Sequence, residues 1–142
     1  MRTKLMTDNL AVGVRLRESD LPLVSRGGGA STTRLVNRSI GAKTILNGIT
    51  NIPPGGAIPL HYHNCEESVL VLSGDGVAVL GNDEVQVTSG DVTWIPPEMP
   101  HQFKNSSDQD TLRIFWTYAS SAATRTMIET GETHSIDSEH SD

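Results

Sequence analysis

The sequence predicts an all-β fold, a sandwich or barrel built from short strands. Short runs rich in Val, Ile, Thr and aromatic residues recur along the chain, and Gly, Asn, Asp and Pro separate them at close intervals. Apolar residues almost nowhere repeat with helical spacing. The 142 residues suffice for one hydrophobic core, so we expect a single barrel domain at residues 31–120.

The N-terminal part, residues 1–30, is weakly patterned and ends in the Gly-rich run SRGGGAS at residues 25–31. We interpret it as an arm followed by a flexible linker, with an outer strand at residues 11–16. An exposed strand edge of this kind generally seeks cover from another strand or a partner chain.

The barrel itself is expected to contain strands of β-branched and aromatic residues, each bounded by turn formers. Trp94 and Ile95, at the end of one such run, are expected in the core. The predicted strands are residues 32–36, 44–52, 67–72, 77–80, 84–88, 92–95, 101–105 and 112–118.

The C-terminal tail, residues 121–142, is polar and acidic, with few apolar residues. Its first part predicts one more strand or a short helix, packed on the barrel or on a neighbouring subunit. From Gly131 onward we expect mobility.

Composition and charge exclude several classes of partner. The net charge is -6 and the basic residues are scattered, whereas a protein that grips phosphate backbones needs a concentrated positive face. No apolar run approaches the length of a membrane span, and no basic amphipathic helix suggests a membrane surface. We therefore expect neither nucleic acid nor a membrane as a partner. The chain has one cysteine, Cys65, and no apolar N-terminal segment, so we expect a cytoplasmic location.

Three histidines and one glutamate carry the functional prediction. In an extended strand side chains alternate between faces, so His61 and His63 point one way and Tyr62 the other. Glu67 opens the next strand, and His101 begins a strand after the turn IPPEMP. In a closed barrel these four side chains can meet around one cation. Burying three imidazoles and a carboxylate without a metal would leave polar groups unpaired, at a high cost in free energy.

The same residues resemble the two motifs of the cupin superfamily. The first motif corresponds to Gly55, His61, His63, Glu67 and Gly74 at the spacing Gly-x5-His-x-His-x3-Glu-x6-Gly. This resemblance implies a small single-domain cupin with a jelly-roll β-barrel, and it implies the four residues named above as metal ligands.

Residues Gly90-x5-Pro96, followed by His101-x3-Asn105, resemble the second cupin motif, with one departure. Its usual glycine two residues after the proline is Glu98 here. Glycine would allow a positive φ without steric cost, so glutamate implies either a different turn or strain.

We expect one divalent metal ion per subunit, held by His61, His63, Glu67 and His101. Three imidazoles and one carboxylate suit Fe, Mn, Ni, Zn or Cu, and affinity alone does not choose among them. Four protein ligands leave open positions on an ion that accepts five or six, as Lewis-acid or oxygen chemistry requires.

Three further residues are candidates for catalysis, each with an alternative. Tyr62 packs outside the site or contributes a hydroxyl, and Glu98 is a loop acid or a proton carrier at the pocket mouth. Arg113 binds a substrate carboxylate if its face of strand 112–118 looks inward; otherwise it is a surface charge.

The resemblance implies a metal-dependent enzyme acting on a small oxygen-rich metabolite. A dioxygenase is favoured by family analogy over an isomerase, lyase or decarboxylase. The alternative is a non-catalytic cupin that binds a sugar or small metabolite, with a partly structural metal. Small cupins are commonly homodimers, so we expect a homodimer here.

Overall fold

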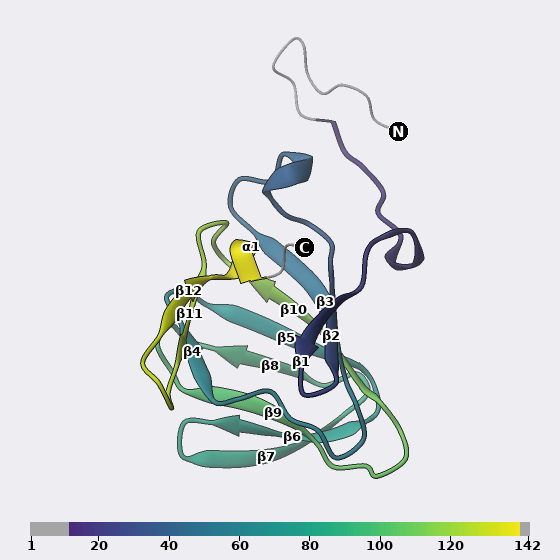
Figure 1. Cartoon of the computed structure of the whole chain (residues 1–142), viewed down its shortest axis with the longest axis vertical. Coiled ribbons are helices and arrows are strands. Elements are labelled where there is room, and N and C mark those ends of the chain that lie inside the picture. Colours follow the sequence, from purple (N-terminus) through teal and green to yellow (C-terminus); the bar gives the residue numbers. More distant parts are fainter. Residues whose placement is uncertain (1–11, 140–142) are drawn as a thin grey trace.

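Two six-stranded antiparallel sheets face each other and form a jelly-roll barrel (Figure 1). The computed structural model describes residues 12–139. This confirms the predicted all-β class. Among the described residues, no helix is long and apolar enough to span a membrane.

The first sheet has the strand order β1-β2-β3-β10-β5-β8. Its strands are β1 (Val24–Gly27), β2 (Ala30–Arg34), β3 (Leu46–Ile52), β10 (Leu112–Tyr118), β5 (Glu67–Ser73) and β8 (Val92–Ile95).

The second sheet has the order β12-β11-β4-β9-β6-β7. Its strands are β12 (Thr133–Ser135), β11 (Thr124–Met127), β4 (His61–His63), β9 (His101–Asn105), β6 (Asp75–Leu80) and β7 (Asp83–Thr88). Helical segments are short: two 3-10 turns, Glu18–Asp20 and Arg38–Ile40, and the helix α1 (Ile136–Glu139).

Strand β10 lies at the centre of the first sheet, between β3 and β5, and settles which of its faces is internal. Leu112, Ile114, Trp116 and Tyr118 alternate as buried residues and belong to the core. Arg113 therefore lies on the outer face. Its guanidinium donates to Asn51 Oδ1 at 2.9 Å and forms an ion pair with Glu18 on that face.

Two predictions for the N-terminal part are wrong. Residues 12–16 form no strand, and Ala11 lies outside the described residues. The run expected as a flexible linker is instead a β-hairpin in which β1 pairs with β2. Gly27, Gly28 and Gly29 all have positive φ, between 62° and 87°, which lets the chain reverse there without the steric cost of a side chain.

The extra C-terminal strand is confirmed. Strand β11 pairs with β4, and β12 pairs with β11 in turn. From Gly131 to residue 139, where mobility was expected, the chain forms β12 and α1, and Ile136 is 1% exposed and packs in the main core. Residues 140–142 lie outside the described residues.

Trp94 corrects another expectation. It is 61% exposed, whereas Ile95 is buried. Neighbouring residues of a strand point to opposite faces, so only one of the two can reach the core. The indole N–H of Trp94 instead donates to Glu66 Oε1 at 2.8 Å on the outer surface.

The last residue of β9, Asn105, has a structural role. Its side-chain amide is buried and donates to the carbonyl oxygens of Ile52 (2.9 Å), Pro53 (3.1 Å) and Asp110 (2.8 Å). It thereby ties the end of β3 and the loop before β10 to the strand that begins with His101. Satisfying buried carbonyl groups in this way fixes the position of β9.

Glu98, which stands where the second motif usually has glycine, adopts the left-handed backbone conformation. Its φ is 67°, and among the described residues it is the one non-glycine with positive φ. Its backbone N–H donates to the carbonyl oxygen of His63 at 2.7 Å, which links the turn before β9 to β4. The turn geometry is therefore kept with glutamate in place, at a steric cost.

We predict that Glu98→Gly stabilises the fold. Relief of the left-handed backbone gains ~1–2 kcal/mol, and the greater freedom of glycine in the unfolded chain costs ~0.5–1 kcal/mol. The free energy of unfolding, measured with urea, should therefore rise by roughly 0.5 kcal/mol. Glu98→Ala, which keeps Cβ, is the control; an equal gain in that variant would mean that the side chain, not the backbone, causes the effect.

Candidate metal centre and pocket

Three histidines of the second sheet form a buried cluster. His61 and His63 lie on the same face of β4, and His101 on β9 is the register partner of His61. The imidazole centroids are 4.4 to 5.0 Å apart, and one ligand atom from each ring lies within 4.8 Å of the others. This cluster is compatible with one metal ion.

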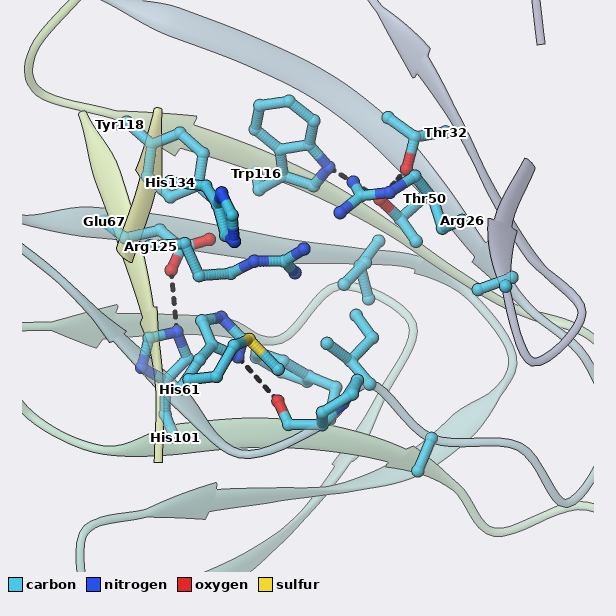
Figure 2. Close-up of a pocket in the computed structure, with 18 residues that line it drawn as sticks. Arg26, Thr32, Thr50, His61, Glu67, His101, Trp116, Tyr118, Arg125 and His134 are labelled. Atoms are coloured by element: carbon cyan, nitrogen blue, oxygen red, sulfur yellow. Dashed lines mark hydrogen bonds and ion pairs between the residues drawn. The ribbon is translucent and has the colours of Figure 1, made fainter. Parts of the chain in front are cut away.

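Glu67 reaches the cluster from the facing sheet. It is the first residue of β5, and its carboxyl oxygen Oε1 lies 3.0 Å from Nε2 of His101 and 3.3 Å from Nε2 of His63. Figure 2 shows the Glu67 carboxyl directed at His101. The candidate centre thus bridges the two sheets, as the sequence predicted for a closed barrel.

Backbone carbonyl groups orient all three imidazoles. The Nδ1 atoms of His61, His63 and His101 lie 2.7, 2.9 and 2.9 Å from the carbonyl oxygens of Pro59, Thr124 and Met99. A carbonyl oxygen only accepts hydrogen bonds, so each Nδ1 carries the proton. Each Nε2 then presents a lone pair, which is the tautomer that a metal-binding histidine requires.

Electrostatics favour neutral His61 and ionised Glu67. Burial, with smaller contributions from His101 and His63, lowers the pKa of His61 well below its ordinary value. Burial alone would raise the pKa of Glu67. The close approach of His101 and His63 outweighs it and lowers that pKa to about 2.

The donor set fits a cation. Nε2 of His63, Nε2 of His101 and Oε1 of Glu67 are buried and have no hydrogen-bond partner within the protein. The lowered pKa of Glu67 depends on hydrogen bonds from these two rings, which need a proton on Nε2. Where each Nε2 carries a lone pair instead, the carboxylate at about 3 Å is repelled unless a cation lies among the three atoms. A divalent ion of the kind bound by imidazole and carboxylate satisfies all of these atoms together.

The cluster forms one wall of a pocket of about 320 Å³. Aromatic side chains line it, among them Phe103, Trp116 and Tyr118. The Trp116 indole lies directly on β3 at Gly48, where a Cβ would stand 2.6 Å from the ring. Its N–H donates to Thr50 Oγ1 at 2.8 Å, so the ring is fixed as a flat wall.

The pocket separates the predicted residues into two groups. His61, Glu67 and His101 line it, whereas Tyr62, Glu98 and Arg113 do not. Tyr62 has the opposite strand parity to the histidines, Glu98 is an exposed turn residue, and Arg113 lies on the outer face of β10. Their catalytic roles stay predictions without geometric support.

The pocket residues that sequence reasoning missed include Arg26, Tyr118 and Arg125. The alternation of β10 defines two faces of the strand, and the sequence did not show whether the face that carries Tyr118 is the inner one. Arg26 and Arg125 lie in the parts interpreted as linker and tail, where only their charge set them apart. Tyr118 contacts His63 edge-on, with the ring centroids 4.5 Å apart.

Comparison with known proteins decides the family. Residues 48–118 match the cupin domain family, and this segment contains the whole cluster. The chain belongs to the cupin family. Its resemblance to small single-domain cupins is thereby confirmed.

Two curated relatives illustrate the range of proteins that this cupin resembles. Protein SchB of Streptomyces halstedii is 30% identical over 97 residues, 68% of this chain and 70% of SchB. Auxin-binding protein 4 of Zea mays is 32% identical over 83 residues, 52% of this chain. The match spans only 41% of the maize protein's length.

Among solved structures, the polyketide cyclase RemF from Streptomyces resistomycificus superposes with a TM-score of 0.71. The superposition covers 88% of this chain and 86% of RemF at 21% sequence identity. At that identity the likeness shows the jelly-roll fold alone.

The lowered pKa values predict that acid destabilises the metal-free protein. The unfolded chain takes up protons at His61 and Glu67 as the pH falls through their ordinary values, 6.5 and 4.5, before the folded state does. Their stabilising contribution is therefore complete above pH 6.5 and declines toward pH 2. Urea unfolding of chelated protein at several pH values measures this decline.

In that experiment, Glu67→Gln should flatten the pH dependence below about pH 5. Glu66→Gln, which alters the neighbouring exposed carboxyl, is the matched control and should leave the profile unchanged. A profile that is identical in Glu67→Gln and the unaltered protein would contradict the assignment of this slope to the buried carboxylate.

The geometry also predicts where metal binds. His61→Ala combined with His101→Ala removes two of three converging imidazoles and should lower metal affinity by more than about 100-fold, since loss of a mere outer partner costs ~10–100-fold. Elemental analysis and competitive chelation measure the effect. His134→Ala, which removes a pocket-lining histidine outside the cluster, should keep its metal. Unchanged stoichiometry and affinity in the double variant would refute the site.

Proposed function

We propose that this cupin is a metal-dependent enzyme that acts on a small, oxygen-rich molecule. The observation that carries the proposal is the convergence of three imidazole lone pairs and one carboxylate on the wall of a pocket. His61, His63, Glu67 and His101 would hold one divalent ion: Fe, Mn, Ni, Zn or Cu. Such an ion supplies a Lewis acid for the carbonyl or hydroxyl oxygens of a ligand.

Tyr118 is the pocket residue best suited to act directly on the ligand. Burial, followed by the nearby Glu67 charge, raises the pKa of Tyr118 well above its ordinary value. The phenol therefore stays protonated at neutral pH and can donate a hydrogen bond to a ligand oxygen that gains negative charge. Apolar side chains such as Phe103 and Ile58 line the same pocket.

Proton transfer or bond cleavage beside a polarised carbonyl group is the reaction class that we favour, as in an isomerase, lyase or decarboxylase. A Lewis acid, a neutral hydroxyl donor and a carboxylate support that chemistry. The name of the similarly folded RemF, a polyketide cyclase, does not describe oxygen insertion. A dioxygenase, which family analogy favours, has no specific support among these relatives.

A second candidate is a non-catalytic binding protein with a partly structural metal. The observation in its favour is the 32% identity to a protein named for binding auxin. In this case the same pocket would hold a small metabolite without turnover. Removal of a purely structural metal would sharply lower the melting temperature.

The test begins with protein purified without chelator, whose metal is identified by elemental analysis. Loss of the α-proton signal of hydroxyacetone or pyruvate in D₂O, followed by NMR, then reports proton transfer next to a carbonyl group. Tyr118→Phe should slow this exchange by roughly 10²-fold at unchanged metal content. Tyr62→Phe, a tyrosine outside the pocket, is the matched control and should keep the full rate.

Oxygen uptake measured on the same samples separates the alternatives. Bound iron with oxygen consumption would replace the favoured reaction class with a dioxygenase. Absence of both exchange and uptake, together with a steep loss of thermal stability after chelation, would refute the enzyme and favour the binding protein.

A further inference from the structure

We propose that the pocket recognises a ligand carboxylate between the guanidinium groups of Arg26 and Arg125, while the ligand's reactive end faces the histidine cluster. The placement of the reactive end rests on the function proposed above, and the carboxylate site deepens it by naming the substrate class. Figure 2 shows the two arginines entering the pocket from different sides, with Arg125 extending across it.

Arg26 lies at an irregularity of β1 and has the same strand parity as Val24, whose register partner Thr32 is buried. In the β1–β2 hairpin, Ser25 pairs with Ser31 and Gly27 pairs with Ala30, so the register shifts at Arg26. An extra residue in one strand leaves the regular ladder and changes the direction of a side chain, and such bulges recur beside active sites. Arg26 lines the pocket next to Thr32, Thr50 and Trp116 (Figure 2).

Arg125 enters from the opposite end of the chain. On β11 its register partners are His63 on β4 and His134 on β12. Its position beside a cluster strand places the guanidinium between the histidine wall and the Arg26 wall of the pocket (Figure 2). A ligand in this pocket can therefore face both Arg125 and the cluster.

The charge balance of the pocket favours an anion. Among the described residues that line it, two guanidinium groups face a single carboxyl group, Glu67, which the cluster already engages. The whole chain, by contrast, has a net charge of -6. Apolar walls strengthen the fields of the two guanidinium groups because they lower the local dielectric.

A carboxylate fits these two groups better than a neutral ligand would. Arginine presents five N–H donors in a planar fork that matches the two oxygens of a carboxylate. Arg26 and Arg125 also interact with other groups of the protein. Five donors are enough for an internal partner and a ligand at the same time.

The two arginines lie outside the segment that carries the family resemblance. Residues 48–118 match the cupin domain and supply the cluster, whereas Arg26 and Arg125 belong to strands added before and after it. Binding of the ligand's charge and activation of its reactive oxygen are thus provided by different parts of the chain. This division is the reason to assign recognition to the flanking strands.

Calorimetric titration of the full chain with benzoate and benzamide tests the proposal. The two compounds have nearly equal shape and differ in charge, so benzoate should bind at least about tenfold more tightly. Arg26→Gln and Arg125→Gln should each weaken benzoate binding about tenfold and leave benzamide binding unchanged. Unchanged benzamide affinity shows that the pocket of each variant is folded.

Arg113→Gln is the matched control, because it removes an arginine from the outer face of β10. It should leave both affinities unchanged. Benzoate binding no tighter than benzamide binding, or equal benzoate affinity in the unaltered protein and both pocket variants, would overturn the proposal.

The double variant His61→Ala with His101→Ala separates this proposal from the proposed function. In that double variant, the affinity for benzoate is measured with both arginines unaltered and again with Arg26→Gln or Arg125→Gln added. If adding either arginine substitution still weakens benzoate binding, the carboxylate site stands even where the metal-dependent function fails. If benzoate binding disappears there and survives in Arg26→Gln and Arg125→Gln, the carboxylate binds at the cluster and the arginine site is refuted.

Discussion

The contact between Glu67 and the histidines is the constraint on which this structure depends. Three imidazoles from one sheet and a carboxylate from the other present electron pairs to one small volume, with Oε1 3.0 Å from Nε2 of His101. Such an arrangement is stable only around positive charge and only when the sheets hold a fixed separation. The packing of the two sheets therefore brings the four side chains together, and carbonyl contacts orient the rings.

Much of this could be predicted because it depends on local periodicity. Alternation along a strand places His61 and His63 on one face, and the close spacing of turns sets the strands that carry Glu67 and His101. Gly90 and Pro96 limit β8, Pro100 precedes β9, and the polar loop at residues 106–110 separates β9 from β10. The predicted bounds of these three strands agree with the observed ones. The sequence also showed that Glu98 replaces the usual glycine of the second motif. In the structure this residue has a positive φ, which glycine adopts without steric cost.

What escaped prediction depends on long-range packing. The alternation of β10 defines two faces but does not say which one meets the opposite sheet, so Arg113 and Tyr118 were equally open. Trp94 shows the converse error, in which hydrophobic character was given more weight than strand parity. The glycine run before β2 was interpreted as a linker because glycine serves both flexible segments and tight hairpins. Its role follows only from the strand against which it pairs.

Gly48 has a consequence that reaches beyond β3. Because no side chain stands there, the Trp116 indole rests against the strand backbone and the pocket keeps its depth. A Cβ at this position would also stand 2.6 Å from the backbone oxygen of Thr33, so any larger residue would displace either the ring or the neighbouring strand β2. The flat aromatic wall thus depends on an absent side chain, at a position that does not itself line the pocket.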